Sequence, residues 1–385
     1  MSKDKKLQEK KRKKIPRLTF ILSLVFPGLA HFKEGRAKPG FLLSSFSALQ
    51  IIILVVGLIN GRMAWFGGVL DQVIASWASV FFVLGFWLLS YISIKRSFLK
   101  QESGGYWTRA ARGFMRHKKG LVGAFIVFLV IWSALFAPLV APYKPLKMDL
   151  MHTITSPGGG GHPLGTDNYG RDILSRIIFG SRVALGVGGG ATLLNMIFGG
   201  LLGLLGGYYK GFIDSVIMRF LEVLNSIPYI IFALLVLSVF GAGVLQIIIV
   251  LGIYGLQAAR IIRSEVLSVR EEDYIMACEA LGAGDFRKIF KHIFPNSMAS
   301  LLVVMTMRIG INIIVVAGLS FLGFGVKPPT PSWGAMLQSA QSYMTVAWWM
   351  AVFPGLAIVL TVFGFNLLGD SLRDVLDPKM SASGR

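Results

Sequence analysis

Long runs of uncharged, largely apolar residues recur along this chain of 385 residues. The hydrocarbon core of a bilayer is about 30 Å thick, so roughly twenty helical residues are needed to cross it. Only 15% of the residues are charged and 54% are hydrophobic, which excludes an ordinary soluble domain. The sequence predicts an all-α polytopic membrane protein with about eight transmembrane helices. The candidate spans are residues 39–61, 72–94, 120–142, 183–209, 223–240, 244–259, 296–326 and 346–369.

The positive charges between these windows predict the topology. A net charge of +20 would suggest nucleic-acid binding in a soluble domain, but here Lys and Arg cluster between apolar windows. In such positions they orient the spans and face anionic lipid, so we expect the lipid bilayer as a partner and no nucleic acid. The positive-inside rule places both termini, the linker of residues 101–119 and the segment of residues 260–295 in the cytoplasm. Residues 143–182 then form a long external loop.

The first hundred residues form an extension to a six-span core, which occupies residues 120–380. A basic cytoplasmic tail, residues 1–17, precedes an apolar stretch, residues 18–32, that ends in small residues like a cleaved signal peptide. Cleavage would place the basic linker outside, against the positive-inside rule. We therefore expect an uncleaved interfacial or re-entrant helix and then a two-span hairpin, which together make a membrane extension over residues 18–100.

A search for catalytic or metal-binding chemistry finds little. The sequence has no P-loop, zinc-protease or nucleophile-elbow motif, and its single cysteine, Cys278, excludes a disulfide framework. His152 and His162 lack further ligands nearby, so we expect no catalytic residue, cofactor or metal. The middles of the spans carry no Asp, Glu or His of the kind that relays ions, which argues against a stand-alone secondary transporter.

A few polar or small residues inside the spans predict packing contacts. Arg219 and Glu222 lie three residues apart and can pair on one helix face. Glycines at 199, 203 and 207 predict a close-packing surface for a neighbouring helix. Arg308 interrupts an apolar window, where it either lines a central cavity or extends towards the cytoplasm.

The segment of residues 260–295 predicts a helix, a turn and a second helix between two spans. Arg260, Arg263 and Arg270 fall on one helical face as a basic stripe, and the residues around Gly282 can end the first helix. A solvated loop remains an alternative. An amphipathic insertion of this length, however, favours an element that docks on a partner.

This segment contains a recognisable motif. Residues 274–296, YIMACEALGAGDFRKIFKHIFPN, resemble the cytoplasmic coupling motif of ABC-importer permeases, in the form found in dipeptide, oligopeptide and nickel permeases. Gly282 and Pro295 match the glycine and the proline of that motif. Other segments of the six-span part also resemble this family, and most closely its second, C-type permease. These segments are RHKKGLVG (116–123), LFAPLVAPY (135–143), HPLGTDNYGRDILSRIIFGSRVAL (162–185), GYYKGFIDSVIMRFLEVLNSIP (207–228), GLSFLGFGVKPPTPSWGAML (318–337) and FNLLGDSLRDVLDPKM (365–380).

The resemblance implies a six-helix ABC importer (type I) permease core and a subunit of an ATP-driven importer for dipeptides or oligopeptides. Such a subunit forms half of the translocation pathway, pairs with a second homologous permease and docks on two ABC ATPase subunits. It receives substrate from an extracytoplasmic binding protein, in a bacterial or archaeal cytoplasmic membrane, and ATP hydrolysis would reside on the partners. Import of nickel or another small solute, a stand-alone secondary transporter and a membrane scaffold are the alternatives.

The resemblance also assigns roles to particular residues. The external loop, with Asp167, Arg171 and Asp172, would lie beneath the binding protein. The alternative for these three residues is a structural role as paired turn residues. The motif's usual Glu-Ala-Ala reads Met276-Ala277-Cys278 here, with an acid one turn later, and Val316 replaces a second frequent acid. Candidate residues of the translocation pathway are Asn225, Ser226, Arg308 and Asn312. The ATPase-coupling residues would be Tyr274, Met276, Ala277, Cys278, Glu279, Gly282, Ala283, His292 and Pro295.

Overall fold

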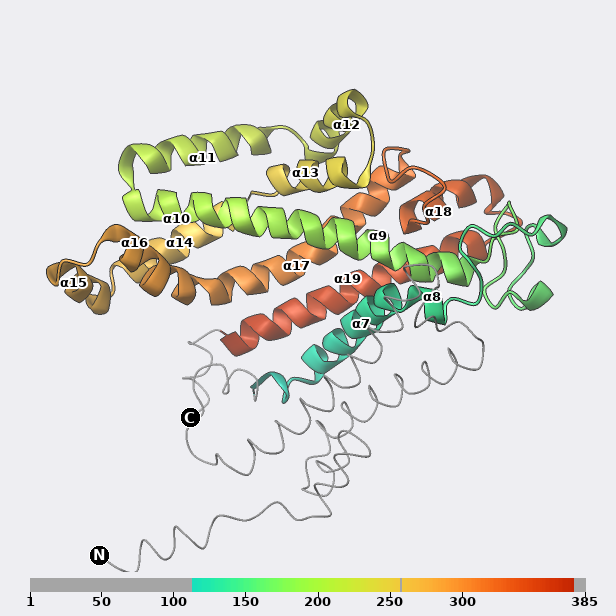
Figure 1. Cartoon of the computed structure of the whole chain (residues 1–385), viewed down its shortest axis with the longest axis horizontal. Helices are drawn as coiled ribbons and strands as arrows, with labels where there is room; N and C mark the ends of the chain where they lie inside the picture. The colour runs from blue at the N-terminus through green and yellow to red at the C-terminus, as the bar shows by residue number, and fades with distance from the viewer. Residues whose placement is uncertain (1–112, 257, 377–385) are drawn as a thin grey trace, which may run out of the picture. The chain divides into compact units, whose positions relative to one another are not determined.

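The structure, a computed structural model, describes residues 113–256 and 258–376 (Figure 1). The described residues fall into two units, residues 113–116 with Phe136–Val140, and His117–Leu135 with residues 141–256 and 258–376. The short helix α8 (Ala137–Val140) belongs to the first unit. The predicted basic tail, interfacial helix and two early spans lie outside the described residues. Everything below concerns the second unit.

Four helical segments of this unit are long and apolar enough to cross a membrane, counted over the described residues. They are α7 (Lys118–Leu135), the continuous run of α9 (Ile173–Leu194) and α10 (Gly200–Tyr209), the Ser300–Phe321 part of α17 (Phe294–Phe321), and α19 (Trp349–Leu376). A π-helical turn over Asn195–Gly199 joins α9 to α10. These segments confirm four of the six predicted core spans.

The other two predicted spans are broken helices. α11 (Gly211–Ser226) meets α12 (Tyr229–Phe240) at 85°, and α13 (Val244–Tyr254) meets α14 (Ala258–Arg270) at 41°. If each bent pair is one span, the described part of the chain has up to six spans, as predicted.

The candidate span of residues 223–240 is therefore not one continuous helix. Ile227 has φ −88° and ψ 128°, outside the helical region, and Pro228 follows it. Proline has no amide hydrogen to donate and disfavours helical backbone at the residue before it, so the helix ends there.

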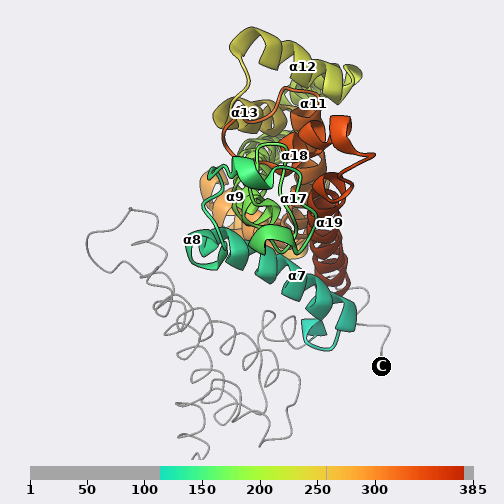
Figure 2. The ribbon, with the colours of Figure 1, turned by 90° about the vertical axis from the view of Figure 1, so that its right-hand side faces the viewer.

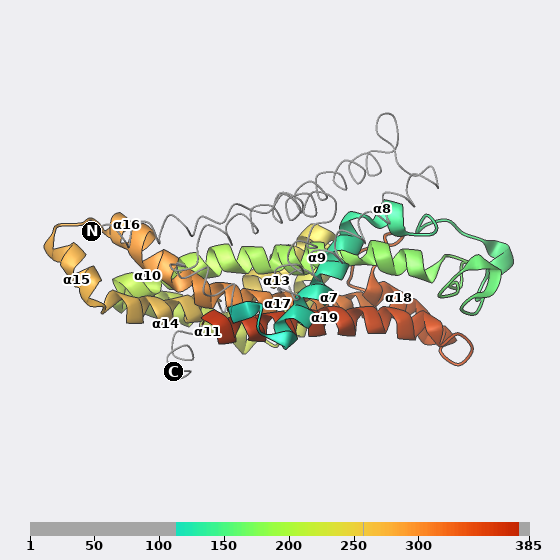
Figure 3. The same ribbon diagram turned by 90° about the horizontal axis from the view of Figure 1, so that it is seen from below.

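The coupling segment and the external loop lie at opposite ends of the bundle (Figure 3). Helices α15 (Asp273–Ala280) and α16 (Asp285–Arg287) form one end, together with a π-helical turn over Lys288–Ile293. The loop before α9 and the helix α18 (Trp333–Ala340) lie towards the other end. Figures 1 and 2 show α11 and α12 on one side of α9 and α17, and α7 on the other.

The external loop ends earlier than predicted. The carboxylate of Asp172 accepts a hydrogen bond from the amide of Ser175 (2.8 Å) and so caps α9. Residues 173–182 therefore form the first turns of a span rather than the end of a loop. Among the described residues, pairing of the β type is limited to an isolated bridge between Thr166 and Asp172.

Glycines allow the spans to approach closely. A Cβ atom on Gly203 would lie 2.5 Å from the carbonyl oxygen of Ala259, and one on Gly207 would lie 2.8 Å from Cβ of Val266. Both contacts are between α10 and α14, so the predicted close-packing surface is confirmed. Residues of α9, α17, α18 and α19 share an apolar core. Within it, the indole nitrogen of Trp333 donates to the carbonyl oxygen of Ile177 (2.9 Å).

Candidate functional site

The first helix of the predicted helix–turn–helix, residues 260–295, is interrupted after Arg270 and forms α14 and α15. α15 ends before Gly282, whose φ of +76° is a left-handed conformation that favours glycine. The amide of Ala283 donates to the carbonyl oxygen of Cys278 (3.0 Å) and the amide of Gly282 to that of Glu279 (2.9 Å), a Schellman motif. Pro295 lies near the start of α17, directly after the π-helical turn Lys288–Ile293.

One face of this segment is packed against the ends of the spans. Ile275 and Ile289 are buried in a cluster with Leu204 of α10 and Val266 of α14. Apolar burial of this kind stabilises each large side chain by about 1.5–3 kcal/mol. The segment is therefore held by the bundle rather than extending freely from it.

The opposite face exposes large apolar side chains. Leu281 is 88% exposed and Phe286 is 76% exposed, and Met276 and Phe290 are exposed as well. The rings of Phe286 and Phe290 lie 4.5 Å apart between centroids. We call Met276, Leu281, Phe286 and Phe290 the tip patch. Several large apolar side chains exposed on one short segment indicate an interaction surface.

The remaining predicted coupling residues lie around the patch. Asn296 donates to the hydroxyl of Tyr274 (2.9 Å), and desolvation by burial raises the pKa of this tyrosine. The sulfur of Cys278 lies 3.9 Å from Nε2 of His292, which connects α15 to the helix that follows the turn. Ala277 is exposed, beside Met276.

Glu279 is the acid that lies one turn after Met276. Its side chain is exposed, and its Oε1 lies 3.9 Å from Nζ of Lys288. Met276 and Glu279 are three residues apart on α15, so they share one exposed face. The acid is thus present one turn later, beside the tip patch.

Three further polar residues of this end were not predicted from the sequence. The hydroxyl of Tyr208, at the end of α10, donates to Oδ1 of Asp285 (2.6 Å), and the same oxygen lies 3.1 Å from Nζ of Lys288. This tyrosine pairs with a residue 77 positions away. The i, i+3 spacing of Asp285 and Lys288 is the one local signal for this arrangement.

The basic stripe is mostly used inside the chain. Arg263 forms a bidentate ion pair with Asp214 of α11, with its NH2 2.6 Å from Oδ2. Arg270 donates to the carbonyl oxygen of Tyr208 (2.6 Å), whereas Arg260 is exposed. Two of the three arginines thus connect α14 to the hairpin of α10 and α11 instead of facing a partner.

The candidate pathway residues occupy two places. Asn225 and Ser226 lie at the end of α11, beside the break at Pro228, and each side chain donates to a carbonyl oxygen of its own helix. Asn312 of α17 is buried and donates to Oγ1 of Thr192 in α9 (3.0 Å). Arg308, one turn earlier, is half-buried.

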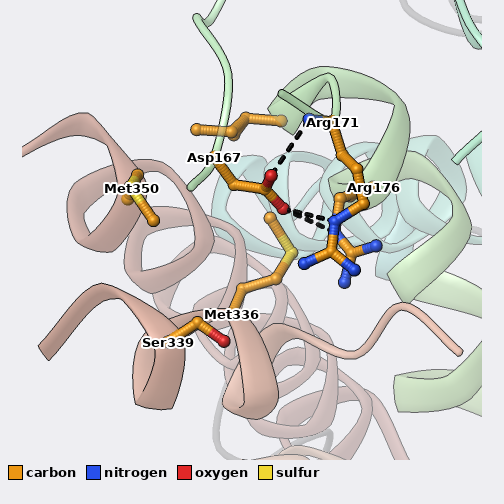
Figure 4. Close-up of a pocket in the computed structure, with 7 residues that line it drawn as sticks. Asp167, Arg171, Arg176, Met336, Ser339 and Met350 are labelled. Atoms are coloured by element: carbon orange, nitrogen blue, oxygen red, sulfur yellow. Dashed lines mark hydrogen bonds and ion pairs between the residues drawn. The ribbon is translucent and has the colours of Figure 1, made fainter. Parts of the chain in front are cut away.

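The three candidate residues of the external loop are buried and paired. Nε of Arg171 donates to Oδ2 of Asp167 (2.7 Å), and the other carboxylate oxygen accepts from two backbone amides. Arg176 of α9 lies 3.7 Å from the same carboxylate, and these residues line a small pocket with Met336 (Figure 4). The arrangement is that of paired turn residues, the alternative role given to them above.

Asp172 completes the loop. Its Oδ1 accepts from Nδ1 of His162 (2.9 Å) and its Oδ2 from Oγ of Ser175 (2.6 Å). His152 instead donates to Asp149 (3.0 Å), and this hydrogen bond lowers the pKa of the aspartate. The two histidines thus bind separate carboxylates, and the described residues contain no group of three or more potential metal ligands.

The structure also shows the surroundings of other residues that the sequence analysis named. Arg219 and Glu222 form the predicted ion pair (2.8 Å), and both side chains are exposed. Val316 is buried in an apolar cluster with Val187 and Leu319. A carboxylate at this buried position would lack solvation.

Comparison with known proteins identifies the family. Residues 199–382 match the model of the binding-protein-dependent transport system inner membrane component. Residues 105–157 match the N-terminal transmembrane domain of oligopeptide transport permease C. The two matches cover the helix–turn–helix and the first part of the external loop, up to residue 157.

Named proteins of several bacteria align with most of the chain. A glutathione transport system permease protein of Pectobacterium atrosepticum is 41% identical over 277 residues, which cover 72% of this chain and 92% of that protein. A dipeptide transport system permease protein of Alkalihalophilus pseudofirmus is 39% identical over 277 residues, with 72% and 91% covered. A di/tripeptide transport system permease protein of Pseudomonas aeruginosa is 40% identical over 275 residues, with 70% and 91% covered.

These matches agree with the apolar helices and confirm the family that the motifs predicted. They indicate an integral membrane permease subunit rather than an enzyme. The chain belongs to the family of inner membrane components of binding-protein-dependent transport systems, the permeases of ABC importers.

Proposed function

We propose that this chain is the permease subunit that couples ATP hydrolysis on partner subunits to the import of peptides. The observation that carries the proposal is the tip patch, which projects apolar side chains from a segment whose other face is fixed in the bundle. An ATPase subunit with an apolar groove would accept Leu281 and Phe286, as helix-in-groove partners do. Two such ATPases, one for each permease, would drive transport, and the hydrolytic site would reside on them.

The substrate class follows from the relatives. Those named above transport glutathione, dipeptides or tripeptides by their names, and all are small peptides. We therefore assign dipeptides or oligopeptides to this chain. An extracytoplasmic binding protein would deliver them above the external loop, whose buried Asp167 and Asp172 keep the loop's shape rather than touch the partner.

One chain supplies half of the pathway. A second, homologous permease would face the exposed side of α11 and α12, and the break at Pro228 would bring Asn225 and Ser226 towards the pathway. Both termini and the coupling segment would lie in the cytoplasm, in the cytoplasmic membrane of a bacterium or archaeon.

Copurification from the native membrane tests the coupling role. The tagged chain is solubilised in mild detergent, and bound proteins are identified and assayed for ATP hydrolysis. The variant Leu281→Asp/Phe286→Asp should lose at least 90% of the bound ATPase, because a carboxylate cannot be buried unpaired in an apolar groove. Deletion of residues 274–295 should do the same while membrane insertion is retained.

The matched control is Met151→Asp, at an equally exposed apolar residue of the external loop. It should bind ATPase like the wild type. Wild-type ATPase binding by the double variant would refute the docking surface. The rate of ATP hydrolysis by the purified complex is then compared between binding protein loaded with dialanine, with glutathione and with Ni²⁺. The ligand that stimulates hydrolysis identifies the substrate class.

A further inference from the structure

The end of α10 is joined to the coupling segment by a polar cluster in which Tyr208 and Lys288 are buried and Asp285 is exposed. We infer that Tyr208 is a positioning residue that transmits movement of the coupling segment into the span formed by α9 and α10. The inference rests on the proposed function, since it supposes that an ATPase moves the segment. The polar cluster consists of Tyr208, Arg270, Asp285 and Lys288, and we call it the Tyr208 cluster.

The first contacts of the cluster tie α10 to the helix after Gly282. Tyr208 is 7% exposed and its hydroxyl donates to Oδ1 of Asp285 at 2.6 Å. Nζ of Lys288 lies 3.1 Å from that oxygen and 5.7 Å from the centroid of the tyrosine ring. Lys288 is itself buried, so its charge is held between the carboxylate and the ring.

A second set of contacts ties the same tyrosine to α14. Arg270 donates to the carbonyl oxygen of Tyr208 (2.6 Å), and its guanidinium carbon lies 5.4 Å from the ring centroid. Tyr208 therefore contacts both α14 and α16, the first through its backbone carbonyl and the second through its hydroxyl. Nearby, Lys210 lies 3.6 Å from Glu271, a further link between the α10–α11 turn and the segment.

These contacts make the segment and the end of α10 move together. If the segment shifted alone, Tyr208 and Lys288, each 7% exposed, would lose the half-exposed carboxylate of Asp285, and a buried polar group left unpaired is costly. Ile275 and Ile289 pack in the same apolar cluster as Tyr208, which resists sliding. A displacement applied at Leu281 or Phe286 therefore carries the end of α10 with it.

The span beyond the cluster can carry the displacement further. α9 and α10 form one run of 37 helical residues, Ile173–Tyr209, from the cap at Asp172 to the Tyr208 cluster. The π-helical turn at Asn195–Gly199 is the place within that run where a bend would be absorbed. The external loop and the coupling segment are thus joined by one continuous helix.

The charges of the cluster persist at neutral pH. The hydroxyl of Tyr208 and then Lys288 lower the pKa of Asp285, and the same tyrosine and aspartate raise the pKa of Lys288. Both groups therefore stay ionised while the importer works.

Hydrogen–deuterium exchange on the purified complex tests the inference. The wild-type complex is compared in ATP-free buffer and after trapping with ATP and vanadate. Trapping should change amide exchange in residues 271–290 and also in residues 200–209. In Tyr208→Phe, which loses the hydroxyl alone, the change in residues 271–290 should persist and that in residues 200–209 should fall at least threefold.

The neighbouring substitution Tyr209→Phe is the matched control, because it removes the same group from an exposed tyrosine and should behave as wild type. Asp285→Ala removes the acceptor of the Tyr208 hydroxyl together with the ion pair to Lys288, so it should lower the response of residues 200–209 at least as much as Tyr208→Phe, and the double variant should lose no more than Asp285→Ala alone. A purely structural tyrosine would lower the melting temperature and leave the response of residues 200–209 intact, which would overturn the inference. Loss of the response in both regions would also overturn it. A wild-type chain that binds no ATPase refutes the proposed function instead.

Discussion

At the scale of single residues, Asp172 connects the external loop to the first turn of α9. Its carboxylate is buried and accepts hydrogen bonds from His162 and from the amide and hydroxyl of Ser175. Asp172→Ala leaves these buried donors unpaired and removes the cap, so we expect the free energy of unfolding to fall by about 1–3 kcal/mol. Thermal unfolding of the purified protein in detergent measures this. Asp149→Ala, whose pairing with His152 is exposed, should change it far less, and an equal loss would refute the distinction.

The Tyr208 cluster predicts a particular pH dependence. The pKa of Asp285 is lowered, so its stabilising contribution is complete above its ordinary pKa and is lost as pH falls through the lowered value. The pKa of Lys288 is raised, so its contribution is complete below its ordinary pKa and is lost as pH rises through the raised value. With ordinary values of about 4 and 10.5, the destabilisation by Tyr208→Phe should be constant from about pH 5.5 to pH 9. Melting curves at three pH values check this, and a change across that range would contradict it.

The residues of the coupling segment differ in how far the sequence could predict them. Gly282 forms a left-handed turn and Pro295 follows a π-helical turn, both local features that their residue types indicate. Tyr208 and Asp285 are far apart along the chain, and their pairing depends on how α10 packs beside the segment. Hydropathy and spacing carry no information on such a contact.

At the scale of helices, the contact of α10 with α14 depends on Gly203. A Cβ atom there would lie 2.5 Å from the carbonyl oxygen of Ala259, which is backbone and cannot rotate away. Gly203→Ala should therefore lower the free energy of unfolding by about 1–3 kcal/mol. Gly189→Ala is the control, because a Cβ at Gly189 meets no atom within 4 Å, and it should be neutral or stabilise by up to about 1 kcal/mol. Equal melting temperatures for the two variants would refute this packing argument.

The candidate pathway residues predict different access to water. Ser226 is exposed at the end of α11, whereas Asn312 is buried between α9 and α17. In a Cys278→Ser background, Ser226→Cys should react with a polar maleimide at least ten times faster than Asn312→Cys, because a buried thiol is shielded from the reagent. Labelling of membrane vesicles, followed by mass spectrometry, measures the two rates. Equal rates would show that Asn312 meets the pathway as directly as Ser226.

The helix breaks show where sequence reasoning ends. Hydropathy predicted the order of the core spans because lipid requires apolar length. Hydropathy did not predict the 85° bend between α11 and α12. Apolar length and charge carry no information on such a bend, and Pro228 lies inside one of the apolar windows. Proline signals the possibility of a bend, but its size depends on the helices packed around it.

At the scale of the whole molecule, the buried pairs form a path between two functional ends. The external loop is fixed by Asp167 and Asp172, the long helix α9–α10 begins at that loop, and the Tyr208 cluster lies at its other end. Apolar packing sets the shape of the bundle, while these polar pairs decide which parts must move as one. The two kinds of contact therefore have separate effects, on stability and on coupling.

The predicted N-terminal extension offers the last test. The family matches begin at residue 105, so the transport machinery shared with the relatives lies in the remainder of the chain. We expect the extension to pack on the outside of the six-span core and to be accessory. A variant without residues 1–100 should keep ATPase binding and at least half of the wild-type peptide uptake, because α7 to α19, the coupling segment and the external loop are all retained. Uptake of labelled dialanine or glutathione into cells, normalised to the amount of inserted protein, measures this. If uptake disappeared while the variant still inserted and bound ATPase, the extension would be part of the transport mechanism itself.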